Sequence, residues 1–226
     1  MALEVLYEDN HLIIVNKKAG DIVQGDKTGD VPLSEDVKGY IKEKHNKPGA
    51  VFLGTIHRLD RPTSGIVVYA RTSKALSRMN KLFKDKEVKK TYWAVVESKP
   101  PKKEDELVHY LKKTEKQNKS YVVAADTAGA KKAELHYKWV TSSDRYHLLE
   151  VDLGTGRHHQ IRAQLSHIGC IIKGDLKYGA KRSNKDGSIH LHARSILFVH
   201  PVSGEAIKIT APVPADPVWS FFEKRN

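Results

Sequence analysis

Residues 57–70 have the sequence His-Arg-Leu-Asp-Arg-Pro-Thr-Ser-Gly-Ile-Val-Val-Tyr-Ala. The apolar run at 66–70 predicts a buried β-strand, and the turn formers before it predict a loop rather than a helix. Asp60 lies in this loop, flanked by Arg58 and Arg61. Nearby cations favour the ionised form of a carboxyl group, so Asp60 is a candidate nucleophile. The alternative is an ion-paired turn that takes no part in a reaction.

Bulk composition indicates a polyanionic partner. The chain has 226 residues and a net charge of +12, from 39 Lys and Arg against 27 Asp and Glu. A domain this basic usually binds nucleic acid through its phosphates, although simple surface charge is the alternative. Clusters of lysine and arginine occur at 81–90, 99–103, 112–119 and 181–185. This spread favours a broad contact with folded RNA over a short basic tail.

The single cysteine and the termini limit the cellular context. Cys170 stands alone, so no disulfide can form within the chain, and its apolar neighbours predict a buried thiol without a nucleophilic role. The N-terminus lacks a signal-peptide pattern, and no apolar run approaches the roughly 20 residues needed to span a bilayer. We therefore expect a soluble, cytoplasmic protein with no membrane partner.

The remaining pattern predicts an α+β fold with a mixed, mainly antiparallel sheet and flanking helices. Strands are expected at 12–15, 66–70, 92–96, 133–140, 146–153, 189–199 and 205–210, with an exposed excursion or hairpin at 99–119. Helices are expected at 33–44, after an N-cap at Thr72 or Ser73, at 158–168 before Gly169, and at 217–222. The length predicts a single domain spanning residues 1–226.

The loop at 57–65 resembles the HRLD-x-x-TSG signature of the RluA-type pseudouridine synthases, which isomerise uridine to pseudouridine in RNA. The resemblance extends over about residues 5–213 and implies the pseudouridine synthase fold with a central catalytic cleft. It also implies that Asp60 is the catalytic residue. Many relatives carry a small RNA-binding domain ahead of this core. Because the resemblance begins at once, we expect a stand-alone catalytic core without that accessory domain.

Three further segments follow the family's order. Residues 89–94, Lys-Lys-Thr-Tyr-Trp-Ala, resemble the segment whose tyrosine lines the uracil pocket, here Tyr92. Residues 154–162 resemble Gly-Arg-Thr-His-Gln-Ile-Arg, whose last arginine, here Arg162, pairs with the catalytic aspartate, while Ile161 packs at the pocket. His158 replaces the usual Thr or Ser, which is expected to weaken a helix cap. Residues 16–20 resemble Asn-Lys-Pro-x-Gly, with Lys18 in the proline position.

The resemblance implies a role for each of these side chains. Asp60 either attacks the anomeric carbon of the ribose or abstracts a ribose proton, and the sequence leaves both routes open. Arg162 would orient the carboxylate through a fork of donors that lysine lacks. The phenol of Tyr92 would help to remove the proton from carbon 5. Arg58 would fill the stack left by a flipped-out uridine, and Arg61 and Arg157 would contact RNA. No cofactor is expected.

Histidines raise a metal hypothesis, because His190 and His192 would share one face of a strand. No paired cysteines or carboxylates accompany them, so a metal is not expected, and His57 is expected to order the signature loop rather than act as a base. Asp175, in a segment resembling the family's Gly-Asp-x-x-Tyr-Gly, is expected to cap a turn. Two other functions remain open: a non-catalytic RNA-binding protein and a metal-dependent RNA hydrolase. We expect a monomer that acts on tRNA or rRNA.

Overall fold

The computed structural model describes residues 3–25 and 29–225. The chain forms two compact units. Unit 1 contains the described residues up to Lys89 together with Ala193–Pro212, and unit 2 contains Lys90–His192 and the described residues from Val213 onward. No helix in the described part of the chain is long and apolar enough to cross a membrane.

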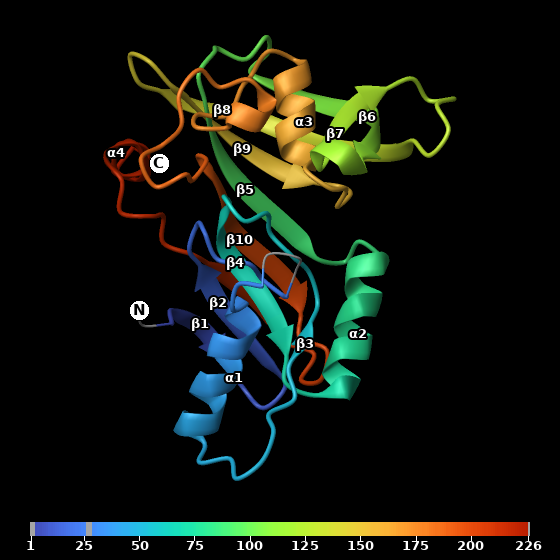
Figure 1. Cartoon of the computed structure of the whole chain (residues 1–226), viewed down its shortest axis with the longest axis vertical. Helices are drawn as coiled ribbons and strands as arrows, with labels where there is room; N and C mark the ends of the chain where they lie inside the picture. Colours follow the sequence, from blue (N-terminus) through green and yellow to red (C-terminus); the bar gives the residue numbers. More distant parts are fainter. Residues whose placement is uncertain (1–2, 26–28, 226) are drawn as a thin grey trace. The chain divides into compact units, whose positions relative to one another are not determined.

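Unit 1 is built on antiparallel strand pairs flanked by two helices (Figure 1). Its elements are β1 (Val5–Glu8), β2 (Leu12–Lys17), α1 (Leu33–Lys44), β3 (Gly54–Thr55), β4 (Ser64–Ala70), α2 (Ser73–Lys84) and β11 (Ala206–Thr210). β10 (Leu191–Val199) begins in unit 2 and continues into unit 1. Within unit 1 the hydrogen-bonded order is β1-β2-β4-β10, with β3 paired to β4 and β11 paired to β10.

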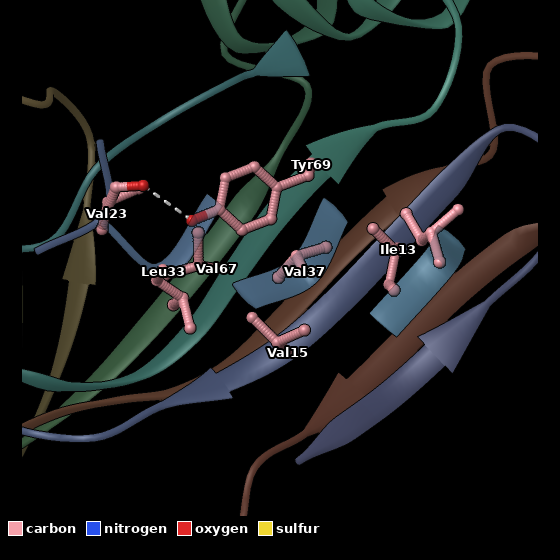
Figure 2. Packing of buried hydrophobic residues seen from close by; sticks show 8 residues of the cluster. Ile13, Val15, Val23, Leu33, Val37, Val67 and Tyr69 are labelled. Carbon is pink, nitrogen blue, oxygen red and sulfur yellow. Dashed lines mark hydrogen bonds between the residues drawn. The ribbon is translucent and has the colours of Figure 1, made fainter. Parts of the chain in front are cut away.

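A cluster of apolar side chains forms a core of unit 1 (Figure 2). On one face of β2 and β4, Ile13 lies opposite Tyr69 and Val15 lies opposite Val67. Leu33 and Val37 of α1 pack against this face, since the apolar residues of that helix recur at helical spacing. The Tyr69 hydroxyl donates a hydrogen bond to the carbonyl of Val23 at 2.9 Å. Burial of apolar surface therefore fixes the strands from which the 57–65 loop emerges.

Unit 2 contains a run of antiparallel strands in the order β5-β9-β8-β6-β7 (Figure 1). The strands are β5 (Lys89–Val96), β6 (Glu104–Thr114), β7 (Lys119–Val123), β8 (Lys131–Ser142) and β9 (His147–Leu153). The helices are α3 (Gln160–His167) and α4 (Pro217–Glu223), with short 3₁₀ turns η1 (Glu115–Gln117) and η2 (Leu176–Tyr178).

Each helix of unit 2 packs on a different part of its strands. Trp219 and Phe222 of α4 join Trp93 and Val95 of β5 in one apolar cluster. Another cluster is formed by Leu111 of β6, Ala133 of β8, Ala163 of α3 and Tyr178. α3 thereby packs against β6 and β7.

The α+β prediction with a mainly antiparallel sheet is confirmed. The helix expected at 33–44 forms with those bounds, and Thr72 caps α2 by accepting a hydrogen bond from the Ala75 amide. In the segment expected to be an exposed excursion or hairpin, β6 and β7 pair antiparallel around η1, and the hairpin continues to Val123, beyond the expected end at 119. The start of the helix expected at 158–168 was wrong, because α3 begins at Gln160.

Candidate active site

Asp60 lies, partly exposed, in the loop that joins β3 to β4 of unit 1. Its carbonyl accepts a hydrogen bond from the Thr63 amide at 3.0 Å, which closes a turn at the centre of the signature. His57 orders the start of this loop, because its Nε2 accepts a hydrogen bond from the Val68 amide at 3.1 Å and its ring stacks on Phe83. An Nε2 that accepts from a backbone amide carries no proton itself, so this contact agrees with the ordering role expected for His57.

Lys17, at the end of β2, supports the same loop and was missed by the sequence analysis. Its side chain is 1% exposed, and its Nζ donates to the carbonyls of Lys18, Asp21 and Arg61 at 2.8, 2.8 and 3.1 Å. The Arg61 carbonyl also accepts from the Gly20 amide at 2.9 Å. One buried ammonium group thus ties the 17–21 turn to the residue that follows Asp60.

Burial lowers the pKa of Lys17 to about 8, although the charges of Asp21 and Asp60 act in the opposite direction. A sequence signal for this side chain existed. Lys17 shares the inward face of β2 with Ile13 and Val15, since side chains two residues apart lie on one face of a strand. A lysine that continues an inward apolar alternation is a candidate buried cation.

Gly65 explains the glycine of the signature. Its φ is +113°, and a Cβ there would lie 2.4 Å from the carbonyl oxygen and 2.5 Å from the amide nitrogen of Ala193 in β10. Both atoms belong to backbone, so they cannot rotate away as a side chain would. The second residue of β4 therefore has no side chain, which lets the start of this strand lie against β10.

The two arginines beside Asp60 differ in their surroundings. Arg61 pairs with Asp30 on the surface, and its Nε donates to the Gly20 carbonyl at 3.0 Å. Arg58 is exposed. Arg61 thus contributes to holding neighbouring loops of unit 1, whereas Arg58 presents its side chain to the solvent.

Arg162 of α3 forms a buried ion pair in unit 2. Its Nε and Nη2 donate to the two carboxylate oxygens of Asp175 at 2.7 and 2.8 Å, with side chains 5% and 1% exposed. The guanidinium also lies over the ring of Tyr178, 5.1 Å from its centroid. The expectation that Asp175 caps a turn was wrong, because its carboxylate makes no cap hydrogen bond to η2 and binds Arg162 instead.

The N-terminus of α3 also differs from the expectation for His158. The N-cap is His159, with a φ of +52° and no side-chain cap, while the Nδ1 of His158 contacts the Ser120 hydroxyl at 2.9 Å. The Gln160 side chain holds the segment before the helix, because its Oε1 accepts from the Arg157 amide at 2.9 Å and the Thr155 hydroxyl at 2.7 Å. His158 therefore lies one residue before the N-cap of α3 and is not the capping residue.

His159 lies beside the buried pair as a neutral ring. Its Nδ1 is 3.1 Å from the Tyr178 hydroxyl. Burial, followed by the positive charge of Arg162, lowers the pKa of His159 to about 2. The positive charge next to Tyr178 is therefore that of Arg162, with Lys119 over the same ring at 4.8 Å.

The other site residues named from the sequence also lie in unit 2. Tyr92 is in β5 opposite Val151 and is 7% exposed, and Ile161 of α3 is 4% exposed. Arg157 is exposed just before α3, and its Nε donates to the Lys132 carbonyl at 2.9 Å. Tyr92 and Arg162 thus belong to one unit and Asp60 to the other.

The histidines considered for a metal site are engaged with protein groups. His190 contacts Asn184 through Nδ1 and Asp216 through Nε2, both at 3.0 Å, and its ring stacks on Trp219. His192 is fully buried beside the same tryptophan. Among residues 3–25 and 29–225, no group of three or more His, Cys, Asp or Glu side chains has the arrangement of a metal site. These histidines anchor the start of α4.

Comparison with known proteins now adds to this geometry. Residues 11–167 match the family model described as RNA pseudouridylate synthase. The chain is 32% identical over 219 residues to ribosomal large subunit pseudouridine synthase C of Buchnera aphidicola, which covers 94% of this chain and 68% of that protein. It is 31% identical over 224 residues to ribosomal large subunit pseudouridine synthase D of Zymomonas mobilis, covering 95% and 70%.

A solved structure, human RNA pseudouridylate synthase domain containing 4, superposes with a TM-score of 0.80 at 24% identity and covers 98% of this chain and 93% of that one. This likeness establishes the pseudouridine synthase fold. The family match and the two relatives confirm the resemblance that the 57–65 loop carries. The chain belongs to the RNA pseudouridylate synthase family, in its RluA-type branch, and is an isomerase that acts on RNA.

Proposed function

We propose that this enzyme converts specific uridines of structured rRNA or tRNA to pseudouridine, with Asp60 as the reacting carboxylate. The strongest support is that the loop carrying Asp60 combines an accessible carboxylate with an anchored backbone. Asp60 is partly exposed, yet the backbone beside it is held by the buried ammonium of Lys17. A carboxylate that must meet a bulky substrate needs both access and a fixed position.

The reaction exchanges one bond of the ribose for another. The bond between C1′ and N1 breaks, its electron pair leaves with the uracil, the base turns, and C1′ joins C5. The proton on C5 is then released, and N1 takes up a proton. Asp60 starts this sequence by one of two routes. It either attacks C1′, and the bond it forms breaks as C5 joins C1′, or it removes the C2′ proton and returns it to C2′ as C5 joins C1′. All atoms of the product come from uridine and water, so the balance requires no cofactor.

Arg162 and Tyr92 supply the supporting chemistry in this proposal. Asp175 binds the Nε and Nη2 donors of Arg162 within unit 2. In the proposed reaction the charge and the forked donors of Arg162 would keep the Asp60 carboxylate ionised and oriented. The ring of Tyr92 would stack on the uracil, and its phenol would take part in removing the C5 proton.

RNA recognition would rest on exposed cations and on flipping of the target base. A uridine within a stack cannot reach a partly enclosed carboxylate, so it must rotate out of the helix. Arg58 is proposed to occupy the vacated position, because a guanidinium can stack on bases and contact phosphate. Arg61 and Arg157 would contact the backbone. The two relatives are named for the large ribosomal subunit, so rRNA of that subunit is the first substrate to test.

The test is the Asp60→Asn variant on in-vitro transcribed large-subunit rRNA and on unmodified tRNA. Pseudouridine is counted by mass spectrometry of the digested RNA, and its position is mapped by chemical modification and primer extension. We expect the wild-type enzyme to modify a defined uridine and the Asn variant to give background levels with nearly unchanged RNA affinity. Asp85→Asn is the matched control, since Asp85 is an exposed carboxylate of the same unit that pairs with Lys81.

Each alternative function predicts a different result. A non-catalytic RNA-binding protein would bind these RNAs without forming pseudouridine at any position. A metal-dependent hydrolase would shorten the RNA and lose activity with a chelator, whereas pseudouridine formation should be unaffected by it. Formation of pseudouridine by Asp60→Asn at a tenth of the wild-type rate would remove Asp60 as the reacting group.

A further inference from the structure

The loop that joins η2 to β10 presents three cations to the solvent. Lys181, Arg182 and Lys185 are all exposed, and the loop belongs to unit 2. In the part of the chain that the structure describes, none of these three side chains has a carboxylate, a hydrogen-bond acceptor or an aromatic ring as its partner. Their positive charge is therefore not neutralised by the protein itself.

The other three clusters of lysine and arginine are partly neutralised by contacts within the protein. Each contains a lysine that pairs with a carboxylate: Lys81 with Asp85, Lys102 with Asp105 and Lys113 with Glu115. A paired lysine must give up its partner before it can neutralise a phosphate. The cluster at 181–185 needs no such exchange.

Asp186, the carboxylate next to this cluster in the sequence, is engaged by a serine. Its Oδ1 accepts from the Ser188 hydroxyl at 2.6 Å and from the Ser188 amide at 3.0 Å. These hydrogen bonds lower the pKa of Asp186. The carboxylate thus closes the end of the turn and does not pair with Lys185.

Asn184, in the middle of the loop, anchors it to the body of unit 2. Its Oδ1 accepts from the Lys173 Nζ at 2.6 Å, which orients the amide group. Its Nδ2 donates to the Ser188 carbonyl at 2.9 Å and to the His190 Nδ1 at 3.0 Å. The amide is also closely packed, since a Cβ on Gly174 would lie 2.7 Å from the same Nδ2.

This anchor continues into the interior through His190. The His190 Nδ1 accepts from Asn184, so its Nε2 carries the proton and donates to Asp216 at 3.0 Å. Burial lowers the pKa of His190, which keeps the ring neutral. Asp216 in turn caps the start of α4. The loop is therefore held at its centre while its cations stay at the surface.

We propose that the loop at 181–185 binds the phosphate backbone of the RNA substrate, with Lys181, Arg182 and Lys185 each neutralising one phosphate. This inference rests on the proposed function, which makes RNA the substrate, and it adds a contact region to those proposed above. Cations without a protein partner release counterions from RNA on binding. A loop that is already ordered also loses less conformational entropy on binding than a mobile one. Contacts to phosphate position the RNA and carry no sequence information.

The experiment compares the salt dependence of RNA binding between the wild type and a triple variant. The variant carries Lys181→Gln, Arg182→Gln and Lys185→Gln, and the probe is the large-subunit rRNA transcript at roughly 50 to 200 mM salt. We expect the log–log slope to become shallower by roughly 2 to 3 and the affinity at about 150 mM salt to fall roughly 50-fold. The single-turnover rate at saturating enzyme should stay within about twofold of wild type, because the lost contacts only bind the substrate.

A matched control removes the same amount of charge from lysines that are paired within the protein. It carries Lys38→Gln, Lys81→Gln and Lys102→Gln, whose partners are Glu35, Asp85 and Asp105. We expect its slope to change by less than about half a unit, because these lysines neutralise carboxylates and not phosphates. A second control exchanges lysine and arginine at positions 181, 182 and 185; it keeps the charges and should keep the wild-type slope.

Asn184→Ala tests the anchor separately from the charges. It leaves all three cations in place and removes the contacts to Lys173 and His190. We expect the affinity to fall roughly fivefold, because the loop must then be ordered on binding, while the slope stays at the wild-type value. Contributions to folding alone would lower the melting temperature and leave both binding quantities unchanged.

The salt slopes decide between the outcomes. A triple variant with the same slope as the paired-lysine control would overturn the inference, as would a loss of about tenfold in its saturating rate. If the triple variant does not fold, the three single glutamine variants replace it, and each should lower the slope by just under about one unit. A wild type that shows the expected slopes but forms no pseudouridine would overturn the proposed function and support the loop as an RNA-binding element.

Discussion

Asp60 and Arg162 are held by opposite means. Asp60 lies on a loop whose backbone is fixed, because Lys17 donates to the Arg61 carbonyl and the Asp60 side chain itself stays partly exposed. Arg162 lies on a helix and its side chain is fixed, because a carboxylate binds its edge and an aromatic ring supports its face. The residue proposed to meet the substrate is thus anchored through its main chain, whereas the arginine proposed to support it is anchored through its own donors.

The largest effect should follow from changing the side chain that is held directly. Arg162→Lys keeps one positive charge but cannot bind Asp175 through two donors. Misplacement of a group by about 1 Å can cost roughly 100-fold in rate, and we expect a single-turnover loss of that order. Arg145→Lys, exposed in the same unit, serves as the control. Near-normal rates for the Arg162→Lys enzyme would show that charge alone suffices.

Tyr92 provides a third case, because it lies in the regular strand β5. Tyr92→Phe keeps the ring and removes the phenol. We expect RNA affinity to be unchanged and the rate to fall about tenfold, since water can replace the phenol only partly in a proton transfer. The measurement is product formation under single-turnover conditions. Unchanged rates would leave Tyr92 as a packing surface alone.

Losing the Lys17 contacts that hold the backbone of the Asp60 loop should reduce the rate less than losing the contacts that hold the Arg162 side chain. Lys17→Met removes the ammonium that binds three carbonyls and should lower the rate roughly fivefold, because the Gly20 amide still holds the Arg61 carbonyl. Lys18→Met, exposed and adjacent, is the matched control and should leave the rate unchanged. A loss with Lys17→Met as large as that with Arg162→Lys would break the distinction between the two anchors.

The smallest effect is a change of stability with pH that the Lys17→Met substitution should remove. Burial lowers the pKa of Lys17 from 10.5 to about 8, so between these values the folded protein binds fewer protons than the unfolded chain. Folding stability from this group is lowest below pH 8 and rises with pH. From pH 8 to pH 9 the wild type should gain about 1 kcal/mol relative to Lys17→Met in urea unfolding. An unchanged difference would mean that Lys17 titrates normally.

The parts of the fold that depend on local patterns could be predicted from the sequence. The spacing of apolar residues predicted α1, and the apolar run at 66–70 predicted β4, because burial imposes periodicity on the residues themselves. Asp60, Tyr92 and Arg162 were identified by motif, and their joint role stays a prediction.

The parts that depend on packing between distant segments could not be predicted. The pairing of Arg162 with Asp175 joins residues 13 apart and arises only when the turn before η2 folds back on α3. Asp175 alone looks like a capping residue, since aspartate favours that position in any turn. The start of α3 was also not predictable. Its N-cap is His159, with a φ of +52° and no side-chain cap, so none of the short polar residues that usually mark a helix start stands there.

The contact between Gly65 and Ala193 has a consequence for how this enzyme would respond to saturation mutagenesis. Every amino acid other than glycine places a Cβ into the backbone of β10, so each substitution should give the same defect whatever its chemistry. A genetic screen scored by growth or modification would therefore mark position 65 as intolerant beside Asp60. The two positions would look alike in such a map, although one fails through geometry and the other through lost reactivity. Thermal melting of the purified variants would separate them.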